Sequence, residues 1–192
     1  MKGTPLLQAH DCVLVIVDFE QTFLDKIDAM QGERLLRKAR WLAAVARHLG
    51  IPVIACIEDG RYPMLAPALQ ATVGDASVLR KIFYSVARDE AVLEALAATW
   101  RRSVVLIGFE TDVCIAQSAL GLLGLQYRVV VVEDVMYAPG QAHAQGLQRM
   151  DRAGITVLSL RALYYEWMAD VVNERAFRRE CSALYDERVI DY

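Results

Sequence analysis

The sequence predicts an α/β fold of three layers, α/β/α, with a six-stranded, mostly parallel sheet of the Rossmann-like type. Three observations favour it. Short runs of apolar, β-branched residues alternate with amphipathic stretches of helical spacing. The apolar runs are continuous, as in parallel strands buried on both faces. No linker, internal repeat or low-complexity segment divides residues 1–192, so we expect a single domain.

Five apolar runs are strand candidates and a sixth is weaker. The five are residues 12–18, 52–57, 103–108, 128–134 and 154–159, and the weaker one is residues 77–82. Apolar residues at helical spacing occupy residues 33–49, 89–99, 114–125 and 141–153. Gly50 and Pro52 end the first of these helices before the second strand begins. Repeated strand–helix units of this kind imply parallel strands.

Composition disfavours several classes of function. Apolar residues make up 55% of the 192 residues, which argues against disorder. No apolar run approaches the roughly 20 residues of a membrane span, and no secretion signal is recognisable. The formal charge of −3 does not favour a nucleic-acid partner. Four irregularly spaced cysteines indicate neither a disulfide framework nor a zinc site, so we expect a cytoplasmic protein.

Several polar residues fall where parallel sheets carry their chemistry, at the carboxyl ends of the strands. Asp18 closes the first strand, and Glu58 and Asp59 follow the second. Lys81 ends the weak strand, and Asp134 closes the fifth. The motif GFETDVC follows the fourth strand and leads into a helix. These residues are the first candidates for a functional site.

Cys114 is the most informative candidate. It opens the helix after the fourth strand, where Thr111 or Asp112 is placed to cap that helix. The positive end of a helix dipole lowers a thiol pKa, so we expect a reactive thiolate. From position alone a buried, inert cysteine is the commoner case, and we keep that interpretation for the other three cysteines.

Asp18 and Lys81 are the other two candidates for chemistry. A carboxyl group partly desolvated at the end of a buried strand has a raised pKa, which suits proton transfer. If Lys81 is buried beside Asp18, it holds the carboxylate and helps to polarise the thiol. Taken singly, Asp18 also fits a solvated strand end, and Lys81 fits a lysine whose stem lies along the surface.

Together these residues resemble a known family. The segments VLVIVDFE, RKIFYSV and VVLIGFETDVCIAQSALGLL are similar to the isochorismatase-like hydrolases, and RVVVVEDV resembles that family's next strand. The resemblance extends from about residue 12 to about residue 178 and includes a late helix over residues 163–177. It implies a catalytic set of Asp18, Lys81 and Cys114. It also implies an oxyanion site from the backbone N–H groups of Glu110 and Cys114, with a cis peptide between Phe109 and Glu110.

The chain departs from the family in two places. Many members have Gln two residues after the aspartate, where this chain has Glu20. The nicotinamidase branch carries metal-binding Asp and His residues after the second strand, where this chain reads IEDGRYPMLAP, without histidine. We therefore expect no metal. We also expect no organic cofactor, because no glycine-rich nucleotide motif follows a strand.

The resemblance implies an amidase-type hydrolase that cleaves a C–N bond of a small molecule through a thioester on Cys114. Ester or vinyl-ether hydrolysis remains an alternative, as does a catalytically idle scaffold that binds a ligand or a partner protein. The residues expected to bind substrate are Phe19, Glu20, Tyr84 and Tyr137, and further pocket candidates are Tyr62, Met64 and Phe83. A homo-oligomer is expected because residues 162–172 hold more large apolar side chains than one helix face readily buries.

Overall fold

The computed structural model describes residues 6–60, 64–74, 78–183, 186 and 189. Its strands form one six-stranded sheet in the order β3-β2-β1-β4-β5-β6, and every pairing is parallel, which confirms the predicted fold class. The strands are β1 (Cys12–Val17), β2 (Val53–Glu58), β3 (Val78–Lys81), β4 (Ser103–Phe109), β5 (Arg128–Tyr137) and β6 (Thr156–Leu158). Strand order reverses between β1 and β4, so their carboxyl ends form the switch point of the sheet.

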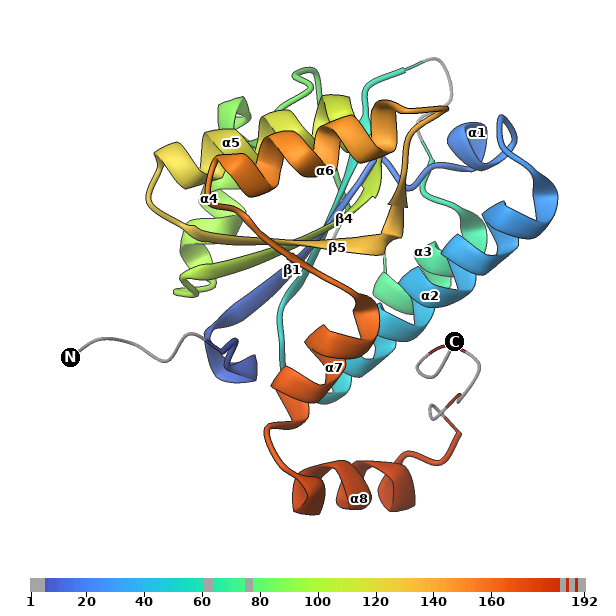
Figure 1. Cartoon of the computed structure of the whole chain (residues 1–192), viewed down its shortest axis with the longest axis vertical. Coiled ribbons are helices and arrows are strands. Elements are labelled where there is room, and N and C mark those ends of the chain that lie inside the picture. Colours follow the sequence, from blue (N-terminus) through green and yellow to red (C-terminus); the bar gives the residue numbers. More distant parts are fainter. Residues whose placement is uncertain (1–5, 61–63, 75–77, 184–185, 187–188, 190–192) are drawn as a thin grey trace.

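Helices cover both faces of the sheet and complete the three layers (Figure 1). On one face lie α2 (Ala29–His48), α3 (Pro67–Val73) and α7 (Leu160–Met168), with α8 (Val171–Glu180) beyond α7. On the other face lie α4 (Glu90–Ala98), α5 (Ala116–Gly124) and α6 (Ala142–Arg152). Short helical segments are α1 (Gln21–Leu24), the 3₁₀ turns Ala9–Asp11 and Val86–Arg88, and a π-helical turn, Thr111–Ile115.

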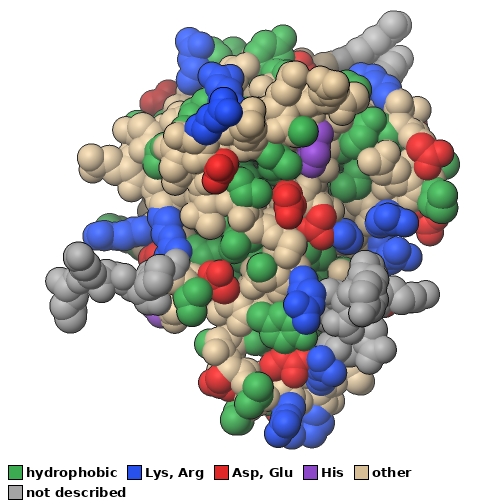
Figure 2. Space-filling view, in the orientation of Figure 1, with side chains coloured by type: hydrophobic (Ala, Val, Ile, Leu, Met, Phe, Trp, Pro, Cys, Tyr) green, Lys and Arg blue, Asp and Glu red, His purple; other side chains and the backbone are tan. Residues whose placement is uncertain are grey.

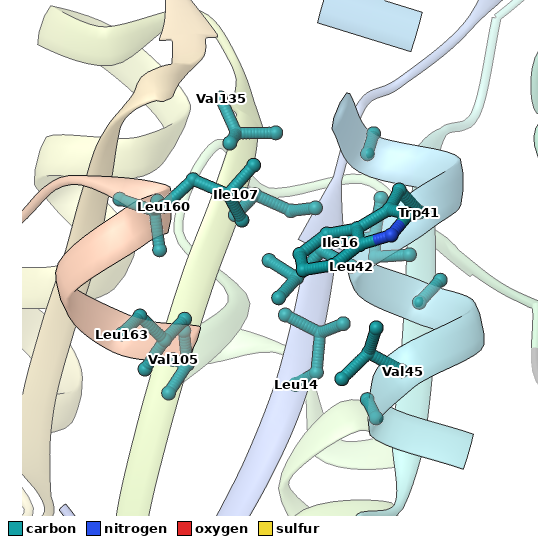
Figure 3. Packing of buried hydrophobic residues seen from close by; sticks show 14 of the residues in the cluster. Leu14, Ile16, Trp41, Leu42, Val45, Val105, Ile107, Val135, Leu160 and Leu163 are labelled. Carbon is teal, nitrogen blue, oxygen red and sulfur yellow. The ribbon is translucent and has the colours of Figure 1, made fainter. Parts of the chain in front are cut away.

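The central strand β1 shows why its sequence is apolar without interruption. All six of its residues are buried, and they divide between two cores. Leu14 and Ile16 face α2, where they pack near Leu42 and Val45 (Figure 3). The alternate residues of the strand belong to the core beneath α4, α5 and α6. A strand buried on both faces has no polar side to display.

The predicted element boundaries shift where a polar residue changes the local pairing. Helix α2 begins at Ala29 instead of residue 33, because the Asp28 carboxylate accepts hydrogen bonds from the Met30 and Gln31 N–H groups and caps the helix. Strand β5 continues past its acidic residues to Tyr137 through a change of register opposite β4. The hydrophobic pattern breaks at that irregularity, although the strand does not.

The late helix expected over residues 163–177 is two helices. Ala169 has φ 67°, which ends α7, and Asp170 then caps α8 by accepting hydrogen bonds from the Val172 and Asn173 N–H groups. Among the described residues, no helix has both the length and the apolarity needed to cross a bilayer. On the face shown in Figure 2, acidic and basic side chains are interspersed over the coloured residues.

Candidate active site

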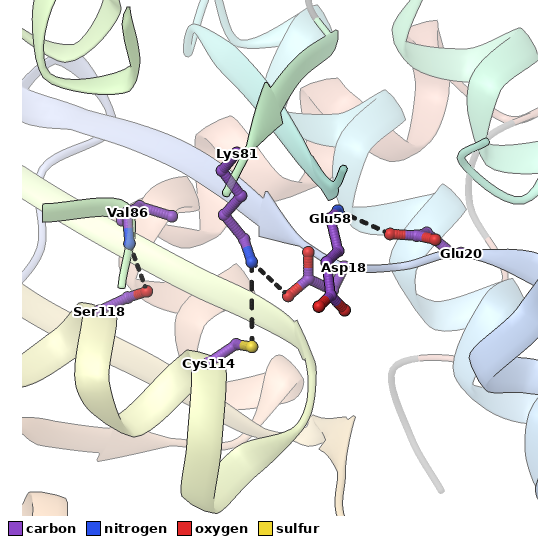
Figure 4. A network of polar contacts seen from close by, with 7 residues as sticks. All are labelled: Asp18, Glu20, Glu58, Lys81, Val86, Cys114 and Ser118. Carbon is purple, nitrogen blue, oxygen red and sulfur yellow. Dashed lines mark hydrogen bonds and ion pairs between the residues drawn. The ribbon is translucent and has the colours of Figure 1, made fainter. Parts of the chain in front are cut away.

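Asp18, Lys81 and Cys114 meet at the carboxyl ends of the central strands (Figure 4). Asp18 directly follows β1, Lys81 is the last residue of β3, and Cys114 lies in the π-helical turn after β4. The Lys81 Nζ atom is 2.7 Å from Asp18 Oδ2 and 3.9 Å from Cys114 Sγ. Their exposed fractions are 0%, 1% and 4% in chain order, so the three groups share a nearly dry environment.

Close contact between β1 and β4 sets this geometry. Gly108 pairs with Val17, and a Cβ atom at Gly108 would lie 1.8 Å from the Val17 carbonyl oxygen. Only glycine permits that approach, and its φ of 127° is also strained for other residues. Asp18 has φ 50° and donates its backbone N–H to the Cys56 carbonyl oxygen at 2.8 Å. The aspartate is therefore fixed by its backbone as well as by its side chain.

The turn that carries Cys114 begins with a cis peptide bond between Phe109 and Glu110, as the resemblance implied. The Glu110 carbonyl oxygen accepts hydrogen bonds from the N–H groups of Val113 and Ile115 and so closes the turn around the cysteine. The Glu110 backbone also forms a hydrogen bond to the Cys114 thiol group that favours its thiolate form. An oxyanion site formed by the backbone N–H groups of Glu110 and Cys114 stays a prediction.

The prediction that Thr111 or Asp112 caps the helix is wrong. The capping position is Glu110, and no side chain accepts a hydrogen bond there. Thr111 is fully buried, and its Oγ1 atom lies 2.8 Å from Nδ1 of His143 on α6. A Cβ atom at Gly146 would lie only 2.9 Å from the Asp112 backbone, so α6 is pressed against the turn. The threonine hydroxyl is therefore used to join the turn to α6.

The expected low thiol pKa is also wrong for this environment. Burial raises the pKa of Cys114 to about 12, and the Asp18 carboxylate beside it adds to the rise. Lys81 and the Glu110 backbone favour the thiolate but do not offset burial and the aspartate. The position of Cys114 at the end of a helix predicted a low pKa, but burial of the thiol and the carboxylate beside it both oppose the thiolate. This environment favours a neutral thiol over a thiolate.

Burial also raises the pKa of Asp18 above the ordinary carboxyl value, although the Lys81 ammonium lowers it part of the way back. For Lys81, burial opposes the charge, but the Asp18 carboxylate outweighs burial and raises the pKa of the ammonium. The pair is thus an ion pair whose carboxylate is more basic than a solvated one. A carboxylate of that kind next to a neutral thiol is placed to accept its proton.

The residues expected to bind substrate are in different environments. Phe19 is fully buried and meets the Phe109 ring edge-on at a centroid distance of 4.9 Å. Tyr137 is half-buried, 6.3 Å from the same ring, and Tyr84 is 56% exposed. Glu20 is 5% exposed, and its Oε1 accepts the Glu58 N–H at 2.7 Å.

The further pocket candidates are described in part. Met64 is 58% exposed, and the Phe83 ring lies under the Arg88 guanidinium at 4.9 Å. Tyr62 lies outside the described residues. A role in substrate binding stays a prediction for each of these residues and for the four first choices.

Sequence reasoning missed three residues around the site. Phe23, in α1, stacks on Phe109 at a centroid distance of 5.8 Å, but a helix of four residues has no detectable period. Phe109 itself lies inside the cysteine motif and was passed over for its polar neighbours. His143 was judged only for metal-ligand spacing, and its contact with Thr111 joins segments that are 32 residues apart.

No group of three or more potential metal-ligating side chains (His, Cys, Asp or Glu) is present among the described residues. The Asp18 and Lys81 groups are instead paired with each other. What the site offers is a buried thiol, a carboxylate and an ammonium in contact, beside a backbone turn with an N–H group directed at the thiol.

Comparison with known proteins identifies the family of this chain. A curated relative, isochorismatase domain-containing protein 1 of Danio rerio, is 32% identical over 146 residues, which cover 72% of this chain and 47% of that protein. The chain thus spans about half the length of that relative. The model of the isochorismatase domain matches residues 12–162, a span that includes Asp18, Lys81 and Cys114.

Two solved structures share the fold. The YcaC gene product of Escherichia coli, described as an octameric hydrolase of unknown specificity, superposes with a TM-score of 0.84 at 21% identity, over 96% of this chain and 95% of that one. N-carbamoylsarcosine amidase of Thermoplasma acidophilum superposes with a TM-score of 0.66 at 24% identity, over 78% and 96%. From the domain match across most of its length, supported by this shared fold, the chain belongs to the isochorismatase family.

Proposed function

We propose that this protein is a hydrolase that cleaves an amide-type C–N bond of a small molecule with Cys114 as its nucleophile. The observation that carries the proposal is the position of Lys81, whose ammonium lies between the Asp18 carboxylate and the Cys114 sulfur at 2.7 and 3.9 Å. An amidase and a hydrolase among the structures with this fold support the reaction class.

The first step follows from the charges of the site. As Cys114 Sγ attacks the substrate carbonyl carbon, Asp18 accepts the thiol proton, because its pKa is raised and the thiol is neutral. The carbonyl π electrons move to the oxygen. The backbone N–H groups of Glu110 and Cys114 stabilise that oxyanion.

The tetrahedral intermediate then collapses. Its oxygen re-forms the carbonyl, the C–N bond breaks, and Asp18 returns the proton to the leaving nitrogen, which leaves a thioester on Cys114. In the second half of the reaction Asp18 takes a proton from water as the water attacks the thioester. The carboxylic acid departs and Cys114 recovers its proton. Lys81 keeps the Asp18 carboxylate oriented throughout and stays protonated.

The same groups also suit an ester, because the attack is identical and only the leaving atom changes. A vinyl ether would not need a thiol that forms a thioester, so the buried Cys114 favours acyl transfer. A catalytically idle scaffold is less consistent with the site, since burying an ion pair is costly and a binding protein gains nothing from placing it against a thiol.

Trapping the acyl-enzyme tests this proposal. The protein is incubated with a panel of small primary amides and with phenyl acetate, quenched in acid during turnover, and digested for mass spectrometry. We expect the Cys114 peptide to carry the acyl group and hydroxylamine to remove it, with no adduct on Cys12 or Cys56. Turnover that persists after Cys114 has been blocked by alkylation would contradict the proposal.

We further propose that the protein is a homo-oligomer that acts in the cytoplasm without a metal or an organic cofactor. The octameric assembly of the Escherichia coli relative supports the first part. The oligomer was expected because residues 162–172 hold many large apolar side chains. In the structure, however, Tyr164, Trp167 and Met168 are buried within the chain. Exposed apolar surface remains at Val171 and Val172, which are 66% and 71% exposed.

A further inference from the structure

Two further carboxylates, those of Glu20 and Glu58, lie near the proposed catalytic groups. Glu58 ends β2, the strand next to β1, and its carboxylate lies beside that of Asp18 (Figure 4). Its negative charge raises the pKa of Asp18 and also that of Lys81. The Glu58 side chain is half-buried, and no described residue gives it a hydrogen bond or an ion pair.

Glu20 is held in place more firmly. Its side chain is 5% exposed, and among the described residues only the Glu58 N–H donates to it, at Oε1. Its backbone is fixed as well, since Glu20 forms an antiparallel bridge with Leu65. Burial raises the pKa of Glu20, and the charges of Asp18 and Glu58 add to the rise. A cation bound at this place would offset the repulsion between these negative charges.

The charges of the described residues do not balance here. Three carboxylates (Asp18, Glu20 and Glu58) stand against one ammonium, that of Lys81, so the formal excess is two negative charges. A further cation at this edge, Arg80, lies 3.9 Å from the exposed Asp59. Asp18 Oδ1 has no hydrogen-bond partner within bonding distance among the described residues, although Asp18 is fully enclosed and the Cys114 thiol faces its carboxylate. Among the described residues, this site therefore has more acceptor oxygens and negative charge than donors and positive charge.

We propose that Glu20 and Glu58 select substrates that carry a positively charged nitrogen, as an ammonium, amidinium or guanidinium group, near the bond that is cleaved. This inference rests on the proposed function. Such a group brings several N–H donors and the missing positive charge at once. A metal ion is disfavoured, because these carboxylates do not form a metal-ligand group among the described residues.

Thiol labelling with charged reagents tests the proposal without a known substrate. Two methanethiosulfonates are compared at low ionic strength, one with a trimethylammonium group and one with a sulfonate group. The Cys114 thiolate attacks the sulfenyl sulfur, a mixed disulfide forms and methanesulfinate leaves. Peptide mapping gives the rate of each reagent at Cys114, and the ratio of the two rates is divided by the same ratio for a free thiol. Because the same thiolate attacks both reagents, the degree of ionisation of the thiol cancels in this corrected ratio.

We expect the cationic reagent to label Cys114 about tenfold faster or more, the lower end of the effect of a cleft lined by one sign of charge. Glu20→Gln and Glu58→Gln should each lower that ratio several-fold. Added salt should lower it too. Glu94→Gln, which removes an exposed carboxylate on α4, is the matched control and should leave the ratio at Cys114 unchanged. The labelling ratio measured at Cys181 should be the same in every variant.

A corrected ratio near one, or a ratio that neither glutamine variant changes, would overturn the charge selection. With pairs of primary amides of equal size, one ending in ammonium and one in methyl, the expected result is a higher kcat/KM for the cation and a loss of that preference in Glu58→Gln. Turnover that survives in Cys114→Ala would refute the proposed nucleophile instead, and the labelling ratio would still report the charge of the site.

Discussion

At the scale of single residues, Asp18 has two opposite effects on Cys114. Its carboxylate accepts the thiol proton during attack in the proposed reaction, yet its negative charge adds to the rise that burial causes in the pKa of the resting thiol. A thiol with a pKa of about 12 is almost fully protonated at pH 7. Iodoacetamide labelling of Cys114 should therefore be slow at neutral pH and should rise steadily with pH, without a plateau below pH 9.

The variant Asp18→Asn separates the two effects. Turnover should fall by about 10²-fold or more, because the proton acceptor is lost. Labelling of Cys114 at pH 7 should instead become about tenfold faster, since the raised thiol pKa falls and Lys81 is left facing the sulfur. Rates of turnover and of labelling are measured on the same protein. A fall in both would mean that Asp18 acts on the fold and not on the thiol.

Replacing Lys81 should lower the stability of the fold as well as turnover, whereas replacing Cys114 should lower turnover alone. Lys81→Met leaves the Asp18 carboxylate buried without its partner, which costs about 3–5 kcal/mol in the free energy of unfolding. Turnover should fall by about 10²-fold. In the double variant with Asp18→Asn, both losses should be smaller than the sum of the single losses. Denaturant unfolding measures the loss in the free energy of unfolding, and kinetics measures the loss in turnover. If the losses of the two single variants add fully in the double variant, the two groups act independently.

At the scale of elements, the contact between α6 and the π-helical turn positions the cysteine. Gly146→Ala places a methyl group 2.9 Å from the Asp112 backbone, so the turn or α6 must shift. We expect a loss of about 1–3 kcal/mol in stability and a clear loss of turnover. Gly124→Ala is the matched control at the end of α5, since a Cβ atom there meets nothing within 4 Å. It should be neutral or slightly stabilising, and equal effects of the two variants would contradict the positioning role.

The sequence predicted elements well where burial alone determines the pattern. The continuous apolar runs identified the strands, because residues of β1 and β4 are buried on both faces. The predicted helix boundaries were wrong where one residue determines them: the Asp28 side chain caps α2, and the backbone conformation of Ala169 ends α7. The predicted thiol pKa was wrong for a similar reason: the direction of its shift depends on burial in the folded chain and on Asp18, which lies 96 positions earlier in the sequence.

At the scale of the whole molecule, Val171 and Val172 are two of several exposed large apolar residues, and we propose that the assembly covers them. We expect light scattering to report a particle larger than one chain at micromolar concentration. Replacing both residues by lysine should shift the protein towards the monomer, because a charged side chain is costly to bury in an interface. A monomeric wild-type protein would contradict the proposed oligomer.

The global fold and the grouping of the three candidate residues were predicted from the sequence for different reasons. Periodicity and composition predicted the layered sheet, whereas the grouping of Asp18, Lys81 and Cys114 came from a resemblance to a family. Periodicity cannot bring residues 18, 81 and 114 together, since only the strand order β3-β2-β1-β4 makes their ends adjacent. The acidic residues Glu20 and Glu58 could be seen in the sequence, but their contact with each other could not.

The central claim is that Cys114 is the nucleophile, and the turnover of Cys114→Ala tests it most directly. The variant removes only a sulfur atom from a turn held by the Glu110 carbonyl oxygen and the Thr111–His143 contact, so the fold should persist by circular dichroism. The account predicts that hydrolysis of any substrate found in the amide screen is abolished. Near-normal turnover by a folded Cys114→Ala protein would contradict it.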